Sequence, residues 1–166
     1  MIPLVSIIGR SNSGKTAVIG KVIKELKHRG YRVGTIKHSV HGFDIDVSGK
    51  DSWKHAQAGA DTVMIASSNR IALIERTAKE KPINELAAYF KSVDIVIAEG
   101  FKKGDTPKIE VFRSKLYDEP VLKKGSNVLA YVVDNPAGFK SDKPVIEWND
   151  TKRLVDLIEE KFLQKK

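Results

Sequence analysis

The stretch Gly9-Arg10-Ser11-Asn12-Ser13-Gly14-Lys15-Thr16 decides the fold. It matches the pattern G-x-x-x-x-G-K-[ST] in full, which is typical of loops that wrap around a phosphate. The glycines allow a tight turn whose backbone N–H groups, together with the next helix N-terminus and the Lys15 ammonium, face one anion. The Thr16 hydroxyl is suited to Mg²⁺. The alternative is a plain Gly/Ser turn between a strand and a helix.

The segments on either side of this stretch favour the phosphate loop. Residues 4–8 form a short apolar run with the composition of a buried strand. Residues 16–29 have apolar side chains at helical spacing, followed by Gly30 as a stop signal. We therefore predict that a nucleoside triphosphate binds here, through Gly9, Arg10, Ser11, Asn12, Ser13, Gly14, Lys15 and Thr16.

The rest of the chain alternates between strand and helix patterns. Strands are expected at 32–37, 62–66, 71–75, 93–98, 109–112 and 128–133, and helices at 51–58, 82–91 and 150–163. Such alternation predicts an α/β protein of the P-loop NTPase fold. We expect three layers, a mostly parallel central sheet with helices on both faces, and a β-hairpin at 62–75. Residues 1–166 are expected to form a single nucleotide-binding domain.

The charge, aromatic content and cysteine content of the chain exclude several classes of function. The chain has 29 Lys and Arg against 21 Asp and Glu, a net charge of +8, which favours anionic partners. Aromatic residues make up only 7% and do not interleave with a basic stretch, so we expect no nucleic-acid partner. Cysteine is absent, which excludes thiolate chemistry. We find no signal peptide or apolar run long enough for a membrane, so we expect a cytoplasmic protein without a membrane partner.

A carboxylate for the metal is expected at the end of a neighbouring strand. The run 93–100 offers Asp94 and Glu99, which lie about 16 Å apart along a strand. Only Glu99 falls at the end where ligands bind in parallel sheets. We predict that Glu99 and Lys15 act in catalysis and that Glu99 and Thr16 hold the metal. The alternative for Glu99 is a solvated loop charge.

The loop after the second predicted strand is rich in ionisable side chains. Asp44 and Asp46 are further candidates for the metal, and Lys37, His38 and His41 for a positive surface that holds a partner or cofactor. Two alternatives remain open. One is a zinc site made of His38, His41 and Asp44. The other is a plain polar loop with Phe43 tucked under it.

Several of these segments together resemble the molybdopterin-guanine dinucleotide biosynthesis adapter family, small P-loop GTP-binding proteins of molybdenum cofactor assembly. The resemblance covers about the first two-thirds of the chain. It is carried by residues 9–16, 35–38 with Asp44 and Asp46, 49–52, His55 with 58–60, 98–102 and 107–111.

The resemblance implies a homodimer that binds GTP and Mg²⁺ and hydrolyses GTP weakly. It also implies an auxiliary role beside the guanylyltransferase that joins GMP to molybdopterin, with molybdopterin and other molybdenum cofactor proteins as further partners. The chain lacks a clear Asn/Thr-Lys-x-Asp guanine motif. Asp134 follows a late strand and is the candidate that reads the base. The rival interpretation of Asp134-Asn135-Pro136 is a turn.

The alternative function is a small P-loop kinase that phosphorylates a metabolite. Such kinases close an arginine-bearing lid over the phosphates. Here Arg70 and Arg113 are scattered along the chain and form no arginine cluster. The pattern therefore favours the adapter over the kinase.

Overall fold

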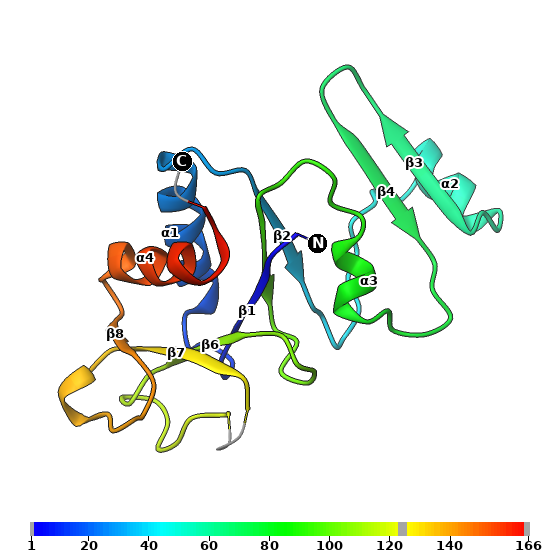
Figure 1. Ribbon diagram of the computed structural model, residues 1–166. Coiled ribbons are helices and arrows are strands. Elements are labelled where there is room, and N and C mark those ends of the chain that lie inside the picture. The colour runs from blue at the N-terminus through cyan, green and yellow to red at the C-terminus, as the bar shows by residue number, and fades with distance from the viewer. Residues whose placement is uncertain (1, 123–125, 165–166) are drawn as a thin grey trace. The chain divides into compact units, whose positions relative to one another are not determined.

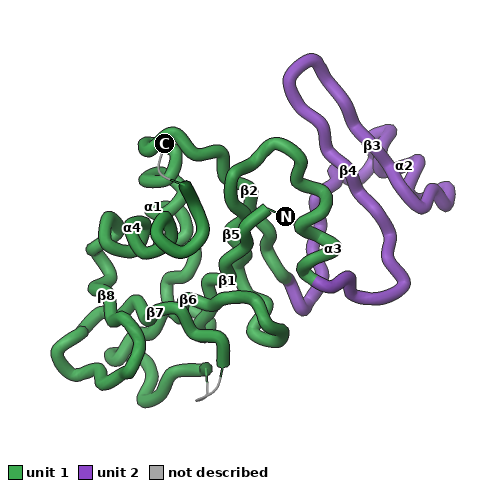
Figure 2. The backbone as a smooth tube through the Cα atoms, viewed as in Figure 1, with its two compact units in different colours: residues 1–38, 83–166 green, residues 39–82 purple. Residues whose placement is uncertain are grey.

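The computed structural model describes residues 2–122 and 126–164 and divides the chain into two compact units (Figure 2). The first comprises residues 1–38 and 83–166, and the second residues 39–82. The main sheet and the phosphate loop belong to the first unit.

Six strands, all parallel, form the sheet of the first unit (Figure 1). Their order is β2-β5-β1-β6-β7-β8. They are β1 (Leu4–Ile8), β2 (Val33–Lys37), β5 (Ile95–Glu99), β6 (Lys108–Phe112), β7 (Val128–Val133) and β8 (Val145–Glu147). The chain leaves β1 toward β2 on one side and later adds β6, β7 and β8 on the other. The end of β1 is therefore the point at which ligands bind in open α/β sheets.

Helices α1 (Lys15–His28) and α4 (Thr151–Phe162) pack together on one face of this sheet (Figure 1). Each buries the apolar stripe that its helical spacing predicts. Strand residues at alternate positions complete the core. Its members include Val5, Ile7, Val18, Val22, Leu26, Ile97, Ile109, Val111, Val132, Leu154, Val155 and Ile158.

The opposite face carries a shorter helix than expected. Helix α3 covers Ile83–Ala87, whereas the sequence predicts a helix over residues 82–91. The α-helix ends because three consecutive hydrogen bonds of the tighter i→i+3 type follow it. The last of them runs from the Phe90 N–H to the Ala87 carbonyl oxygen at 3.1 Å. The ring of Phe90 then packs against Gly34 of β2, at a position where a Cβ would lie 2.5 Å from the ring.

The second unit contains α2 (Asp51–Gln57) and a hairpin of β3 (Thr62–Ala66) and β4 (Ile71–Glu75). The hairpin lies where the sequence predicts it. Helix α2 begins after Lys50, and no side chain caps its first turn.

The expected α/β fold with a parallel central sheet and a hairpin is confirmed. The three-residue strand β8 was missed because it is too short to show a period. In the described parts of the chain, no helix is long and apolar enough to cross a membrane.

Candidate nucleotide site

Residues 9–14 join the end of β1 to the start of α1 in backbone conformations that few residues adopt. Gly14, which caps the helix, has φ 84° and Asn12 has φ 58°. At Gly9 an added Cβ would lie only 2.4 Å from the carbonyl oxygen of Val111 in β6. The loop therefore wraps against the neighbouring strand as closely as a backbone can. No side chain caps the helix at Gly14, so its first backbone N–H groups are suited to an anion.

Three predicted site residues meet beside this loop. The Lys15 ammonium donates to the Arg10 carbonyl oxygen at 2.7 Å, and the Thr16 hydroxyl donates to Glu99 Oε1 at 3.2 Å. Glu99 is brought there because it ends β5, in register with Ile7 of β1. Asp94 lies at the other end of the strand, where its carboxylate accepts from the Arg32 backbone N–H at 2.7 Å. The structure thus separates the two carboxylates as the strand geometry predicts.

Further cations surround Lys15. Burial lowers the pKa of Lys15, Glu99 opposes this effect, and the charges of Lys102 and Lys37 lower the pKa further. Lys37 of β2 lies opposite Glu99 of β5 in the register of these two parallel strands. Lys102 follows Glu99 by three residues and was missed as a site residue, although its place after the strand end is a signal that could have found it. Three lysine side chains and one carboxylate thus interact electrostatically beside the loop.

His38 closes the edge next to Glu99. Its backbone N–H donates to the Glu99 carbonyl oxygen at 3.0 Å, and its ring lies 4.7 Å from that of Phe101. Phe101 has φ 55° and Gly100 has φ 95°, so the chain turns sharply here. A left-handed conformation at a phenylalanine is uncommon and occurs mainly at functional sites.

The remaining candidates of the early loop belong to the second unit. His41 and Asp44 are exposed, and Asp46 Oδ1 accepts from the Val47 N–H and from the Ser52 hydroxyl. Within residues 2–122 and 126–164, no three His, Asp or Glu side chains gather as a metal site would require, so the zinc alternative gains no support. Phe43 is 77% exposed, and the expectation that it tucks under the loop is wrong. The roles of Asp44, Asp46 and His41 stay predictions.

Asp134 is held by the loop after β6. Its Oδ1 accepts from the Ser114 N–H at 2.8 Å and from the Ser114 hydroxyl at 2.9 Å. Burial raises the pKa of Asp134, but these hydrogen bonds outweigh it and keep the pKa below its ordinary value. A 3₁₀ turn at Pro136–Gly138 follows, as the turn interpretation predicts. Asp134 therefore fixes the loop after β6 to the end of β7.

Two aromatic residues far along the chain flank the phosphate loop. The Tyr117 hydroxyl donates to the Ser11 carbonyl oxygen, and the Arg10 guanidinium lies 5.3 Å from the centre of the Tyr117 ring. Trp148 lies so close to Gly14 that an added Cβ would be 2.0 Å from its ring. Sequence spacing could not have found them, because more than a hundred residues separate each from the loop it touches.

A phosphate loop at the switch point of a parallel sheet, with a hydroxyl, a lysine and a carboxylate around it, defines an α/β protein of the P-loop NTPase class.

Comparison with known proteins places the chain within this class. A family model described as molybdopterin guanine dinucleotide synthesis protein B matches residues 4–134. The molybdopterin-guanine dinucleotide biosynthesis adapter protein of Haemophilus influenzae is 37% identical over 95% of this chain and 88% of its own. That of Escherichia coli K12 is 35% identical over 99% of this chain and 95% of its own. The chain belongs to the molybdopterin guanine dinucleotide synthesis protein B family, which confirms the resemblance.

Solved structures agree with this assignment. The crystal structure of Bacillus subtilis MobB is 25% identical, has a TM-score of 0.77, and is matched over 99% of this chain and 100% of its own. A crystal structure of molybdopterin-guanine biosynthesis protein B has a TM-score of 0.72 at 27% identity. The similarity also reaches the last third of the chain, where the motifs carry little signal.

Proposed function

We propose that this protein is a GTP-binding adapter that assists the formation of molybdopterin guanine dinucleotide beside the guanylyltransferase of that pathway. Two relatives with this adapter name cover nearly the whole chain. The observation that best supports nucleotide binding is the hydrogen bond of 3.2 Å between Thr16 and Glu99, next to Lys15. It gathers a hydroxyl, a carboxylate and an ammonium at one helix N-terminus. In this role residues 1–166 act as one nucleotide-binding domain in the cytoplasm.

The residues present fit a triphosphate with Mg²⁺. The Lys15 ammonium donates to the carbonyl of Arg10, and an ammonium has three N–H donors, so donors remain for phosphate oxygens. Thr16 and Glu99 offer the oxygen ligands that Mg²⁺ prefers. Lys37 and Lys102 add positive charge for the phosphates. When bound, the metal would neutralise phosphate charge, while the chain's own residues orient the nucleotide.

The adapter role is tested by purifying the tagged full-length chain from its cells and identifying the captured proteins and the bound nucleotide. We expect a guanylyltransferase and guanine nucleotide. The kinase alternative predicts transfer of the γ-phosphate to a pterin or nucleotide acceptor, which labelled GTP would detect. Neither Arg113 nor Arg70, both of which the structure describes, supports that alternative: the Arg113 guanidinium lies 5.4 Å from the centre of the Trp148 ring, and Arg70 belongs to the second unit.

Glu99→Gln is expected to slow GTP hydrolysis about 10- to 100-fold, the usual loss when a group that supports a metal is replaced. Without Mg²⁺ the same variant should bind GTP more tightly, because the carboxylate then repels the phosphates. Steady-state phosphate release and calorimetry measure the two effects.

The matched control for this variant is Glu160→Gln, which removes an exposed carboxylate of α4. It should change neither quantity. Normal turnover in Glu99→Gln would move the metal assignment to Asp44 or Asp46.

We propose that the chain forms a homodimer through the hairpin of the second unit. Met64 and Leu73 pair across β3 and β4, and Ile71 shares their face. Met64 is 62% exposed, Leu73 42% and Ile71 68%. Contiguous exposed apolar side chains on a sheet face are typical of a protein interface.

Replacing both Met64 and Leu73 by Lys is expected to raise the dimer dissociation constant at least about 100-fold, because like charges then face each other across the interface. Sedimentation at micromolar concentration measures the mass. Ser68→Lys, at the exposed turn of the same hairpin, is the control and should remain dimeric. A dimeric double variant would place the interface elsewhere, and a monomeric parent protein would contradict the homodimer.

A further inference from the structure

A cavity of about 400 Å³ opens beside the ends of β6 and β7 in the first unit. Its walls come from the loop after β6 and from the loop after β7, and include Phe112, Tyr117, Asp118, Asn135, Phe139 and Lys140. The volume lies in the range of small-molecule sites. Neither the motifs nor the proposed phosphate contacts use this cavity.

The cavity adjoins the phosphate loop through Tyr117. Tyr117 lines the cavity, and its hydroxyl donates to the Ser11 carbonyl oxygen. Arg10 lies over the same ring at 5.3 Å. A ligand whose phosphates lie against residues 9–16 could therefore extend past Tyr117 into the cavity.

The loop that carries Tyr117 and Asp118 is tied down at both ends. At its start Ser114 is held by Asp134. At its end the buried carboxylate of Glu110 accepts from the backbone N–H groups of Val121 and Leu122. A wall fixed in this way needs little ordering when a ligand binds, and pre-organisation of this kind increases affinity.

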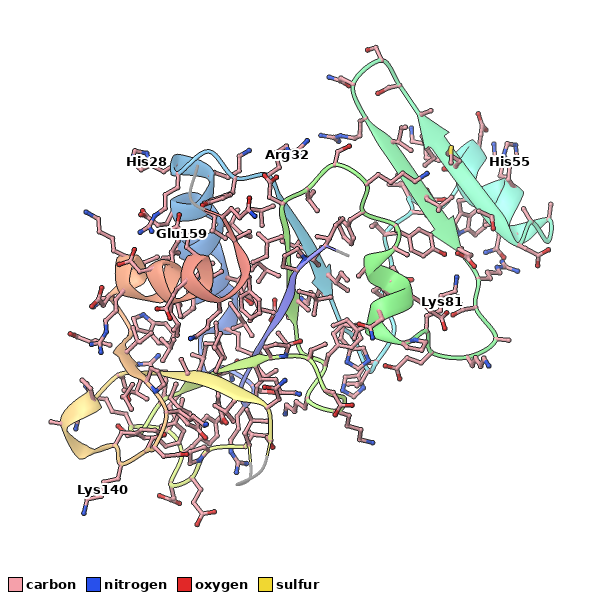
Figure 3. All side chains as sticks on the ribbon, viewed as in Figure 1. His28, Arg32, His55, Lys81, Lys140 and Glu159 are labelled. Carbon is pink, nitrogen blue, oxygen red and sulfur yellow. The ribbon has the colours of Figure 1, made fainter. Side chains whose placement is uncertain are left out.

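The lining combines aromatic rings with a polar edge, as a purine base requires. The rings of Phe112 and Phe139 lie 5.3 Å apart. Asp118 and Asn135 are exposed and line the edge of the cavity. Lys140 points away from the molecule (Figure 3) and is therefore not among the base contacts. Asp134, in contrast, is already engaged by Ser114 and does not belong to the lining.

We propose that this cavity holds the base of the bound nucleotide and that Asp118, and not Asp134, selects guanine. This inference rests on the proposed function. A carboxylate accepts from both N1–H and the 2-amino group of guanine, whereas adenine presents an acceptor at N1. The Asn135 amide can donate to O6. The assignment explains how the chain could read guanine without the usual motif.

The test measures the affinities of full-length protein for GTP, XTP and inorganic tripolyphosphate by calorimetry with Mg²⁺. Asp118→Asn is expected to weaken GTP about 10-fold and to strengthen XTP by a similar factor, because an amide donates to the 2-oxo group of xanthine. Tripolyphosphate, which has no base, should bind unchanged. A merely structural role of Asp118 would not increase XTP affinity.

The control is Glu119→Gln, a neighbouring exposed carboxylate outside the lining, which should alter none of the three affinities. The inference is overturned if Asp118→Asn behaves like this control, if GTP binds no more tightly than tripolyphosphate, or if Asp134→Asn and not Asp118→Asn gives the gain for XTP. If the parent protein binds neither GTP nor tripolyphosphate, the proposed function fails, and the inference fails with it.

Discussion

Lys15→Ala is expected to weaken GTP binding at least about 100-fold, which corresponds to about 2.7 kcal/mol. The ammonium lies within hydrogen-bond distance of the loop, at 2.7 Å from the Arg10 carbonyl oxygen, and is partly shielded from water. Charge-assisted bonds to phosphate in such a place are stronger than those on an open surface. Burial lowers the pKa of Lys15 because it disfavours the charged form, and the negative charge of a triphosphate would offset that cost.

Calorimetry with GTP and with tripolyphosphate checks this prediction. Both ligands should lose affinity to a similar degree, because Lys15 faces the phosphates and not the base. Lys24→Ala, an exposed lysine of the same helix, is the control and should bind as the parent protein does. Unchanged GTP affinity in Lys15→Ala would remove the phosphate-loop interpretation.

Gly9→Ala is expected to lower the free energy of unfolding by about 3 kcal/mol, the upper range for overpacking a closely packed region. The new methyl group would lie 2.4 Å from the Val111 carbonyl oxygen and 2.6 Å from the Ser13 hydroxyl. Val111 is buried in β6 and cannot retreat without disturbing the core on α1. The phosphate loop or the β1–β6 pairing must therefore shift.

Urea unfolding followed by circular dichroism measures this loss. The matched control is Gly20→Ala inside α1, where an added Cβ meets no heavy atom within 4 Å. That change should stabilise the protein by about 0.5–1 kcal/mol, since alanine is the better helix former. Equal stabilities of the two variants would show that the loop tolerates a side chain at residue 9.

Much of the fold could be predicted because its signals are local. The stripe on α1 and the apolar run of β1 each depend on a few consecutive residues, and both lie where they were expected. The end of α3 and the strand β8 could not be predicted in this way. Phe90 leaves the helix to pack on Gly34, and β8 is held only by its pairing with β7. In both, a distant partner decides the local structure.

In the candidate site, too, some features follow from local sequence and others from distant contacts. The amino-acid sequence by itself determined the phosphate loop, because eight consecutive residues form its motif. It also determined that Glu99 lies at a strand end, because the rise per residue of a strand sets its distance from Asp94. The tertiary structure alone decided that Tyr117 and Trp148 flank the loop and that Asp134 is engaged by Ser114. The physical reason is that strand order places β6 beside β1, β7 beside β6 and β8 beside β7, so that their ends lie along one edge of the sheet. No spacing along the chain encodes which strand ends become neighbours.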